Sequence, residues 1–269
     1  MKLSNVFSKR NRVLLRELVV TDFKLRYQGS VLGYAWSLLK PLFLFAIMYV
    51  VFGLLVKLGS IEHYAVYLLL GIVLWTFFSE ATNQGMSSIL ARGDLLRKIS
   101  FPKYIIVLST TISALINLTL NLVIVGVLMA FNGVELGPNS WLVIVYIIEI
   151  YIFALGLALF LSALNVKYRD TGHIWEIIMQ AAFYATPIIY PLSLVVEKSE
   201  LAAQVLLMNP VAQAIQDARH ALVTPETITI SNLFHNPAFT LIPVSMVIIV
   251  FVVGVLYFKK HSAYFAENI

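Results

Sequence analysis

The stretch Trp141–Leu164 reads WLVIVYIIEIYIFALGLALFLSAL and carries a single charged residue, Glu149. Because about 20 apolar residues in helical form cross the hydrocarbon core of a bilayer, this stretch predicts a membrane-spanning helix. Five more stretches have a similar length and apolar character, and they are Tyr34–Val56, Tyr64–Ile89, Tyr104–Phe131, Ile174–Val196 and Phe239–Phe258. The sequence therefore predicts an all-α integral membrane protein with six transmembrane helices.

The composition of the whole chain agrees with this prediction. Of its 269 residues, 60% are hydrophobic and 12% are charged, whereas soluble domains are roughly half apolar and a quarter charged. Too little polar surface remains to cover a globule in water, so lipid must be the solvent. The length fits one domain over residues 1–269, with a membrane part over 34–258 and a tail over 259–269. No cleavable signal is expected before the first span, and the absence of cysteine excludes disulfides and thiol chemistry.

The basic residues predict the orientation of the chain, since Lys and Arg accumulate in cytoplasmic loops. Fifteen of the 19 fall on one face when six spans are threaded through a membrane. That face holds the segment before the first span, the loops after the second and fourth spans, and the C-terminal tail. Both termini are therefore expected in the cytoplasm. The net charge of +5 reflects this topology and not nucleic-acid binding.

Residues 6–28 predict an amphipathic helix at the cytoplasmic interface. Its apolar arc consists of Leu14, Leu15, Leu18, Val19 and Leu25, and the charged residues opposite are Arg16, Glu17 and Lys24. Asp22 falls inside the apolar arc and interrupts it. The helix is either a basic anchor on the membrane surface or a docking element for a partner protein.

The loop between the second and third spans reads GDLLRKISFP over residues 93–102. In it, Leu95, Leu96 and Ile99 would form an apolar knob beside Asp94 and the basic residues Arg97 and Lys98. Such a knob fits a groove on a partner protein. An ordinary basic loop that merely follows the topology is the alternative.

Two spans carry aromatic stripes when plotted at 100° per residue. The first holds Tyr34, Phe45, Tyr49 and Phe52, and the second holds Glu176, Gln180, Phe183, Pro187 and Tyr190. Stripes of this kind are commonly packing surfaces between helices. The second stripe also carries a carboxylate and an amide, which surfaces facing lipid avoid. Aromatic faces beside hydrogen-bonding groups suit sugars.

Charged residues within spans are candidates for function because they are costly in lipid. They are Lys40, Glu80, Glu149 and Glu176. Lys40 and Glu176 lie toward span ends, where they can pair or reach the interface. Glu149 lies deeper, and a proton relay would need such a group.

The segment 197–238, expected outside the cell, is too long for a simple turn. Asn209 followed by Pro210 predicts a helix start. We expect a re-entrant or interfacial helix here, with Val211, Ile215, Ala218 and Leu222 on its apolar face. A plain surface helix is the alternative.

Sequence signatures of enzymes are absent. The chain lacks the Gly-x-x-x-x-Gly-Lys-Ser/Thr phosphate loop, so it is not itself a P-loop ATPase. The five histidines show no metal-ligand spacing, and no nucleophile or paired-acid motif lies on a plausible loop. We predict a transport subunit with no catalytic residue and no metal site.

The run LRYQGSVLGYAWSLLKP over residues 25–41 resembles the entry to the first span of ABC transporter permeases of the polysaccharide export family. These proteins move O-antigens, capsular polymers or teichoic acids. Four further stretches fit in the same order, and they are ISFP at 99–102, YRD at 168–170, TPIIYP at 186–191 and NP at 209–210. The resemblance covers almost the whole chain.

This resemblance implies a homodimer in the cytoplasmic (inner) membrane, bound to two copies of a P-loop ATPase that carries ATP and Mg. It implies ATPase coupling by Arg16, Glu17, Lys24, Arg26, Asp94, Leu95, Leu96, Arg97, Lys98 and Ile99. It implies a channel lined by Tyr34, Phe45, Tyr49, Phe52, Glu176, Gln180, Phe183 and Tyr190. It implies an outer gate formed by Asn209, Pro210, Ile215 and Arg219.

The expected function is export of a lipid-linked, O-antigen-like polysaccharide, with no cofactor bound by this chain and membrane lipids around it. Four alternatives stay open from the sequence. They are export of teichoic acid, export of small lipids or drugs, a membrane glycosyltransferase, and a proton-coupled carrier centred on Glu149.

Overall fold

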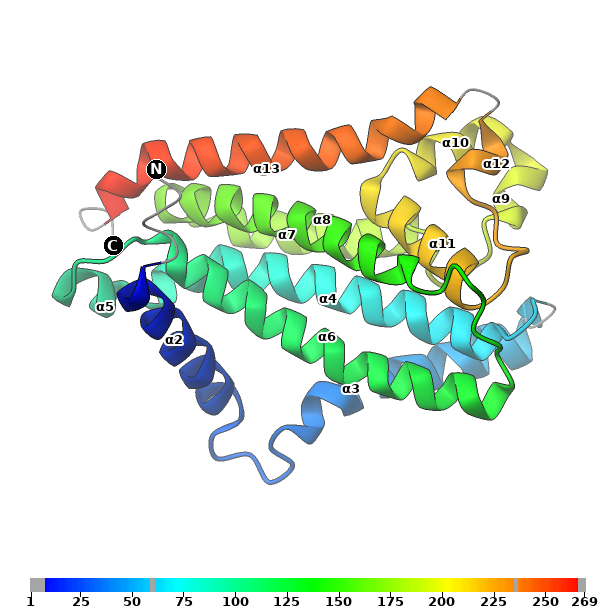
Figure 1. The fold of residues 1–269 in the computed structure, drawn as a ribbon, viewed down its shortest axis with the longest axis horizontal. Helices are drawn as coiled ribbons and strands as arrows, with labels where there is room; N and C mark the ends of the chain where they lie inside the picture. Colours follow the sequence, from blue (N-terminus) through cyan, green and yellow to red (C-terminus); the bar gives the residue numbers. More distant parts are fainter. Residues whose placement is uncertain (1–7, 59–60, 235–236, 266–269) are drawn as a thin grey trace.

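The computed structural model describes residues 8–58, 61–234 and 237–265, without the side chains of residues 25–27 and 237. All regular elements in these ranges are helices, packed side by side in an elongated bundle (Figure 1). Five of them are long and apolar enough to cross a membrane. They are α3 (Ala35–Met48) with its π-helical continuation η1 (Tyr49–Leu55), α4 (Tyr64–Ala91), α6 (Tyr104–Asn132), α7 (Leu142–Lys167), and α13 (Leu241–His261) with η3 (Pro237–Thr240) and η4 (Ser262–Tyr264).

The expected fifth span, Ile174–Val196, is not one continuous helix. Helix α8 (Thr171–Ala185) ends before Thr186, whose backbone is extended. Pro187 has no N–H to donate and disfavours the helical conformation of the residue before it. After this break the chain continues into α9 (Ser193–Lys198) and α10 (Glu200–Leu207). The prediction of one continuous helix was wrong because it followed the apolar run and gave no weight to Pro187 and Pro191 within it.

Helix α4 forms the centre of the bundle, packed against both α6 and α7, and α7 packs in turn against α13. Glycine allows the closest approach between α7 and α13. A Cβ added to Gly254 would lie 2.1 Å from the carbonyl oxygen of Gly156. Close backbone contact at small residues is how helices gain packing energy in lipid, where burial of apolar area gives little.

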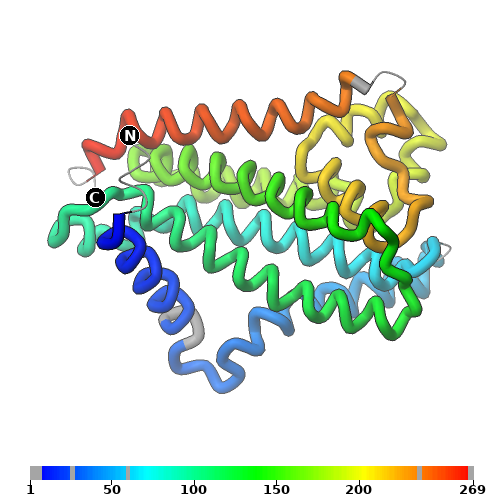
Figure 2. The backbone as a smooth tube through the Cα atoms, in the orientation of Figure 1, coloured from blue at the N-terminus to red at the C-terminus, as the bar shows by residue number. Residues whose placement is uncertain are grey.

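The two ends of the bundle differ in their elements. The start of α2 (Lys9–Tyr27), the short helix α5 (Gly93–Lys98) and the end of α13 lie together at one end (Figure 1). Helices α9 to α12 lie at the other end, with α11 (Pro210–Leu222) and α12 (Ile230–Leu233) among them. Figure 2 shows that α2 leans away from the bundle before the chain turns back into α3.

Helix α11 begins where the sequence predicts. The Oδ1 of Asn209 accepts from the backbone N–H of Val211 at 3.0 Å, and Pro210 occupies the first turn. Nearly all of the helix from Pro210 to Arg219 is buried, against α4, α7, α10 and α13. The alternative of a plain surface helix is therefore wrong, and even the amides Gln213 and Gln216 are enclosed by protein.

Candidate functional site

Helix α2 packs on protein with its apolar arc. Leu14, Leu15 and Leu18 belong to a hydrophobic cluster that also holds Leu96 and Ile105. The charged residues Arg16, Glu17 and Lys24 lie on its exposed side. The side chain of Arg26 lies outside the described part of the chain, as do residues 6 and 7 of the predicted helix. The apolar arc thus holds α2 against α6 and leaves its charged side open.

Asp22, which interrupts the apolar arc, has a partner in the fold. It accepts a hydrogen bond from the guanidinium of Arg92, which caps α4, and a second from the Ser109 hydroxyl on α6 at 3.3 Å. Both ionic side chains are largely buried. Burial lowers the pKa of Arg92 from its ordinary value. This ion pair ties α2 to the junction of α4 and α5.

The short helix α5 presents fewer apolar groups than expected. Leu96 is buried in the cluster beneath α2 and Leu95 is half-buried, whereas Ile99, Arg97 and Lys98 are exposed. The expectation of an exposed knob that includes Leu96 is wrong, because a six-residue helix must bury one face to stay folded. Asp94 is exposed in the first turn, where a carboxylate favours the helix dipole.

The aromatic stripe of α3 and η1 packs against α4. Ring centroids lie 5.7 Å apart for Phe45 and Tyr49, and 6.3 Å apart for Tyr49 and Tyr64. Phe52 is half-buried against the same core. Tyr34 is instead exposed, with its ring 5.7 Å from Phe23 on α2. Whether these residues line a path between two subunits stays a prediction.

The aromatic stripe of α8 borders a cavity of about 290 Å³. Three of the four channel residues expected on this span, Glu176, Gln180 and Phe183, line it opposite α4. Phe183 meets Trp75 of α4 edge-on, with ring centroids 6.0 Å apart. Tyr190 lies apart from the cavity. Its hydroxyl donates to the carbonyl of Tyr184 at 3.2 Å and so closes the C-terminal end of α8.

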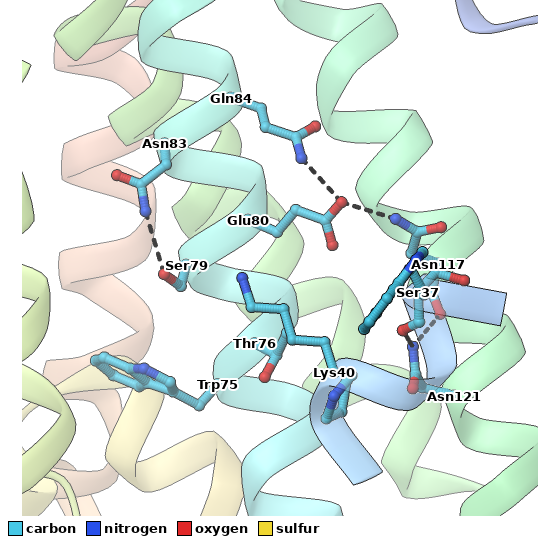
Figure 3. Close-up of a pocket in the computed structure, with 12 residues that line it drawn as sticks. Ser37, Lys40, Trp75, Thr76, Ser79, Glu80, Asn83, Gln84, Asn117 and Asn121 are labelled. Carbon is cyan, nitrogen blue, oxygen red and sulfur yellow. Dashed lines mark hydrogen bonds between the residues drawn. The ribbon is translucent and has the colours of Figure 1, made fainter. Parts of the chain in front are cut away.

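A second cavity, of about 480 Å³, lies between α3, α4 and α6 (Figure 3). Glu80 of α4 accepts from Gln84 at 2.9 Å and from Asn117 of α6 at 2.7 Å. The two cavities share three lining residues, Trp75, Ser79 and Asn83. They adjoin along one face of α4, and we call them together the polar groove.

The sequence predicted only part of this groove. Glu80 and Lys40 stood out as charges within spans, but the amides beside them did not. Their signal was present as spacing: Glu80 and Gln84 are four residues apart on α4, and Asn117 and Asn121 are four apart on α6. Residues four apart share one face of a helix, so each pair marks a polar face in an apolar span.

Arg219 of α11 is fully buried and is held by backbone carbonyls. It donates to the carbonyls of Tyr67 at 2.9 Å, Pro187 at 2.6 Å and Ile188 at 2.7 Å. Its guanidinium carbon also lies 3.6 Å from the ring centroid of Tyr67. The carbonyls freed where α8 breaks are therefore satisfied by this one side chain, which joins α11, α4 and the break. The role in an outer gate that the resemblance implies for Arg219 stays a prediction.

Of the other expected outer-gate residues, two lie at the start of α11 and a third is buried against neighbouring helices. Asn209 and Pro210 form the start of the helix, and Ile215 is fully buried. Among the described residues no group of three or more histidine, aspartate or glutamate side chains could hold a metal ion.

The chain was compared with known proteins. Residues 13–223 match the family model described as ABC-2 type transporter. The chain belongs to this family. It is 34% identical over 203 residues to the O-antigen export system permease protein RfbA of Myxococcus xanthus, which covers 74% of the chain and 76% of that protein. It is 29% identical over 261 residues to a protein of the same name from Klebsiella pneumoniae, covering 94% of each.

Membership of the ABC-2 family gives the chain its general role. It is the multi-pass permease subunit of an ABC exporter in the inner membrane, and it is a transport subunit without a catalytic domain. An exporter of this kind implies an ATPase partner. The resemblance drawn from residues 25–41 and the later motifs is thereby confirmed.

Proposed function

We propose that this ABC-2 permease exports a lipid-linked polysaccharide of the O-antigen type across the inner membrane. The observation that carries the proposal is the polar groove along α4, which is lined by amides, hydroxyls, two carboxylates, one lysine and aromatic rings. Sugars need this combination, because their hydroxyls require hydrogen-bonding partners and their C–H faces pack on aromatic rings. The names of the relatives from Myxococcus and Klebsiella support the same substrate class.

The working unit would be a homodimer with two ATPase subunits. Helix α3 with η1 and helix α8 flank the groove, and both leave a large apolar surface open, with Ile47 and Ile177 more than half exposed. A second copy facing these helices would enclose a path between the two subunits. Tyr34, Phe45, Tyr49 and Phe52 from one side and Glu176, Gln180, Phe183 and Tyr190 from the other are the residues proposed to border it.

The proposed topology has six spans within a single domain over residues 1–269. Helix α8, with the broken segment 186–192 and α9, takes the place of the fifth span, and α11 is the re-entrant helix at the outer gate. The end that holds α2, α5 and the last turn of α13 carries most of the basic residues, so it faces the cytoplasm. Residues 259–269 form the cytoplasmic tail.

The ATPase would dock at this cytoplasmic end. The charged side of α2 and the exposed end of α5 lie on neighbouring elements, and the Asp22–Arg92 pair connects them. A displacement of α2 or α5 by the ATPase would therefore be transmitted to α4 and the polar groove. Coupling is assigned to Arg16, Glu17, Lys24 and Arg26 on α2 and to Asp94, Leu95, Leu96, Arg97, Lys98 and Ile99 at α5, with Leu96 acting from within the core.

Polymer export tests the substrate. Cells that lack this permease should lose the polymer from their surface and accumulate it, still lipid-linked, inside. Vesicles that contain the permease and its ATPase should take up the lipid-linked polymer only with ATP. Normal surface polymer in the deleted cells would overturn the proposal, and a loss of teichoic acid, small-lipid or drug export instead would identify the alternative. Accumulation of unpolymerised sugar would indicate a glycosyltransferase.

Charge reversal tests the docking surface. The double variant Arg97→Glu, Lys98→Glu should insert normally and bind the ATPase at least tenfold more weakly. The matched control is Lys259→Glu, Lys260→Glu, since these two basic residues are also exposed at the same end. Equal ATPase binding by both double variants would exclude a specific role for α5.

A further inference from the structure

The cavity between α3, α4 and α6 is built almost entirely from polar side chains and indoles. Lys40 extends from α3 across the opening toward α4, and the second carboxylate oxygen of Glu80 points away from the two amides that bind the first (Figure 3). The wall of the cavity thus combines the ammonium group of Lys40 with the carboxylate of Glu80. One positive and one negative charge leave it without net charge.

That balance of charge restricts the occupant. A phosphate or carboxylate group would meet the Glu80 carboxylate, and a cation would meet Lys40. A neutral group whose atoms both donate and accept hydrogen bonds satisfies both side chains and the surrounding amides. Hydroxyl groups on a ring have this property.

Two tryptophans give the cavity its apolar part. Trp36 comes from α3 and Trp75 from α4, and both line the space. Trp36 is nearly half exposed, although a large apolar ring gains little by standing at a polar opening. An indole in this position can pack on the C–H face of a sugar ring. A volume of about 480 Å³ lies within the usual range for small-molecule sites.

One buried atom in the wall also lacks a partner. The Oδ1 of Asn117 makes no hydrogen bond among the described residues, while its Nδ2 donates to Glu80. An unsatisfied buried acceptor is unfavourable, so it favours a donor brought in by an occupant or by water. Asn121 next to it is fixed by bonds to the carbonyls of Ser37 and Asn117.

We propose that this cavity is a binding subsite, within one subunit, for a single ring of a neutral sugar, with Lys40 and Glu80 contacting its hydroxyls and Trp36 and Trp75 its C–H faces. The inference rests on the proposed export of a polysaccharide and adds where one subunit holds it. Because the cavity adjoins the one beside α8, a ring held here would anchor a glycan that continues along the polar groove.

Tryptophan fluorescence reads the cavity directly. Of the four tryptophans, two line it, so the variant Trp141→Phe, Trp175→Phe leaves only Trp36 and Trp75. The protein is placed in phosphatidylcholine nanodiscs, since maltoside detergents carry a competing sugar. Glucose, galactose, mannose, rhamnose and N-acetylglucosamine are titrated separately, with glycerol and inorganic phosphate as comparison probes. At least one sugar should change the emission saturably, and neither comparison probe should.

Two variants in the same background locate the binding. Thr76→Phe fills the cavity, and Lys40→Met removes a donor from an exposed side chain, so neither disturbs a hydrogen bond that holds the fold together. Each should weaken sugar binding tenfold or more. Thr119→Ala is the matched control, because Thr119 lies two residues from Asn117 on the exposed side of α6, and its affinity should equal that of the parent.

Three results would overturn the subsite. The first is the absence of any sugar response, and the second is sugar binding by Thr76→Phe and Lys40→Met that is as tight as that of the parent. The third is saturable binding of phosphate or glycerol instead of sugars. These outcomes are separable from failure of the proposed export, because the titration needs neither ATP nor the partner. Sugar binding without polymer export would refute the exporter proposal alone, and polymer export without sugar binding would refute the subsite alone.

Discussion

Helix α4 and the helices at the edge of the bundle differ in how apolar they are and in how much of each is buried in protein. The α4 span has the lowest mean hydropathy of the five, 1.6, and 78% of its most apolar window is buried in protein. The spans of α13 and α3 have values of 2.8 and 2.3, and only 17% and 6% of their windows are buried. In a protein dissolved in water the most apolar helix would be the central one.

The order is reversed because lipid is the solvent. A polar side chain that faces lipid has no partner, whereas one that faces neighbouring helices can find donors and acceptors. Glu80 of α4 binds amides on its own helix and on α6. Ser245 of α13, in contrast, returns its hydroxyl to the carbonyl of Ile242 on the same helix. Hydropathy of a span therefore measures how much of it lipid or another subunit must cover.

The largest expected effect comes from removing the buried Arg219 of α11, which packs against α4. Arg219→Met deletes bonds to three carbonyls, one of them on α4, and each buried acceptor left alone costs about 1–3 kcal/mol. We expect the free energy of unfolding to fall by about 5 kcal/mol. The protein purified in detergent should melt at a lower temperature or should no longer be monodisperse.

Two further variants interpret that result. Arg169→Met removes an exposed arginine and should leave the melting temperature unchanged. Gly71→Ala would place a Cβ 2.1 Å from Arg219 Nη2, so it should destabilise through the same contact. If Arg219→Met melted like the parent, the carbonyls at the break of α8 would not depend on this side chain.

A smaller effect compares equal truncations in the two kinds of helix. Leu70→Ala on α4 empties a site that is wholly buried, and we expect a cost of about 3 kcal/mol. Ile248→Ala on α13 alters a side chain that is 58% exposed, and we expect a cost below about 0.5 kcal/mol. Thermal unfolding of both variants measures the difference. Equal costs would mean that the exposed face of α13 is covered as tightly as the core.

The smallest effect concerns the end of α4 that lies beside α2 and α5. Asp22→Asn keeps the size of the side chain but leaves the largely buried Arg92 without its counter-charge, at a cost of about 1–2 kcal/mol. Helix α2 should then detach more often, so trypsin should cut faster at the exposed Arg16 and Lys24. Glu17→Gln, on the exposed side of the same helix, is the control. Identical cleavage rates would show that the apolar cluster alone holds α2.

Much of the bundle followed from the sequence, and two features were missed. The long helices begin and end within a few residues of their predicted bounds, and Asn209 begins α11 as expected. The break after Ala185 and the burial of Leu96 were not predicted. The break follows from Pro187, and the carbonyls there accept hydrogen bonds from the distant Arg219. Leu96 is buried because α2 covers it.

The groove shows the same division at finer scale. Glu80 and Lys40 were visible in the sequence because charged residues are rare in apolar spans. Asn117 and Gln84 were not singled out, because an amide in a span is inconspicuous until another helix supplies its partner. Asp22 looked like a flaw in an amphipathic pattern, and only its contact with Arg92 explains it.

The sequence by itself determined that lipid surrounds this chain, where most of its long helices run, and which ABC family it belongs to. The first two properties follow from local composition, because the bilayer acts on each segment of about 20 residues separately. The family follows from short local motifs. Only the tertiary structure decided which helix is central, how the carbonyls at the break of α8 are satisfied and how the polar groove is formed. Those features require a donor on one helix to meet an acceptor on another, and no single segment contains both.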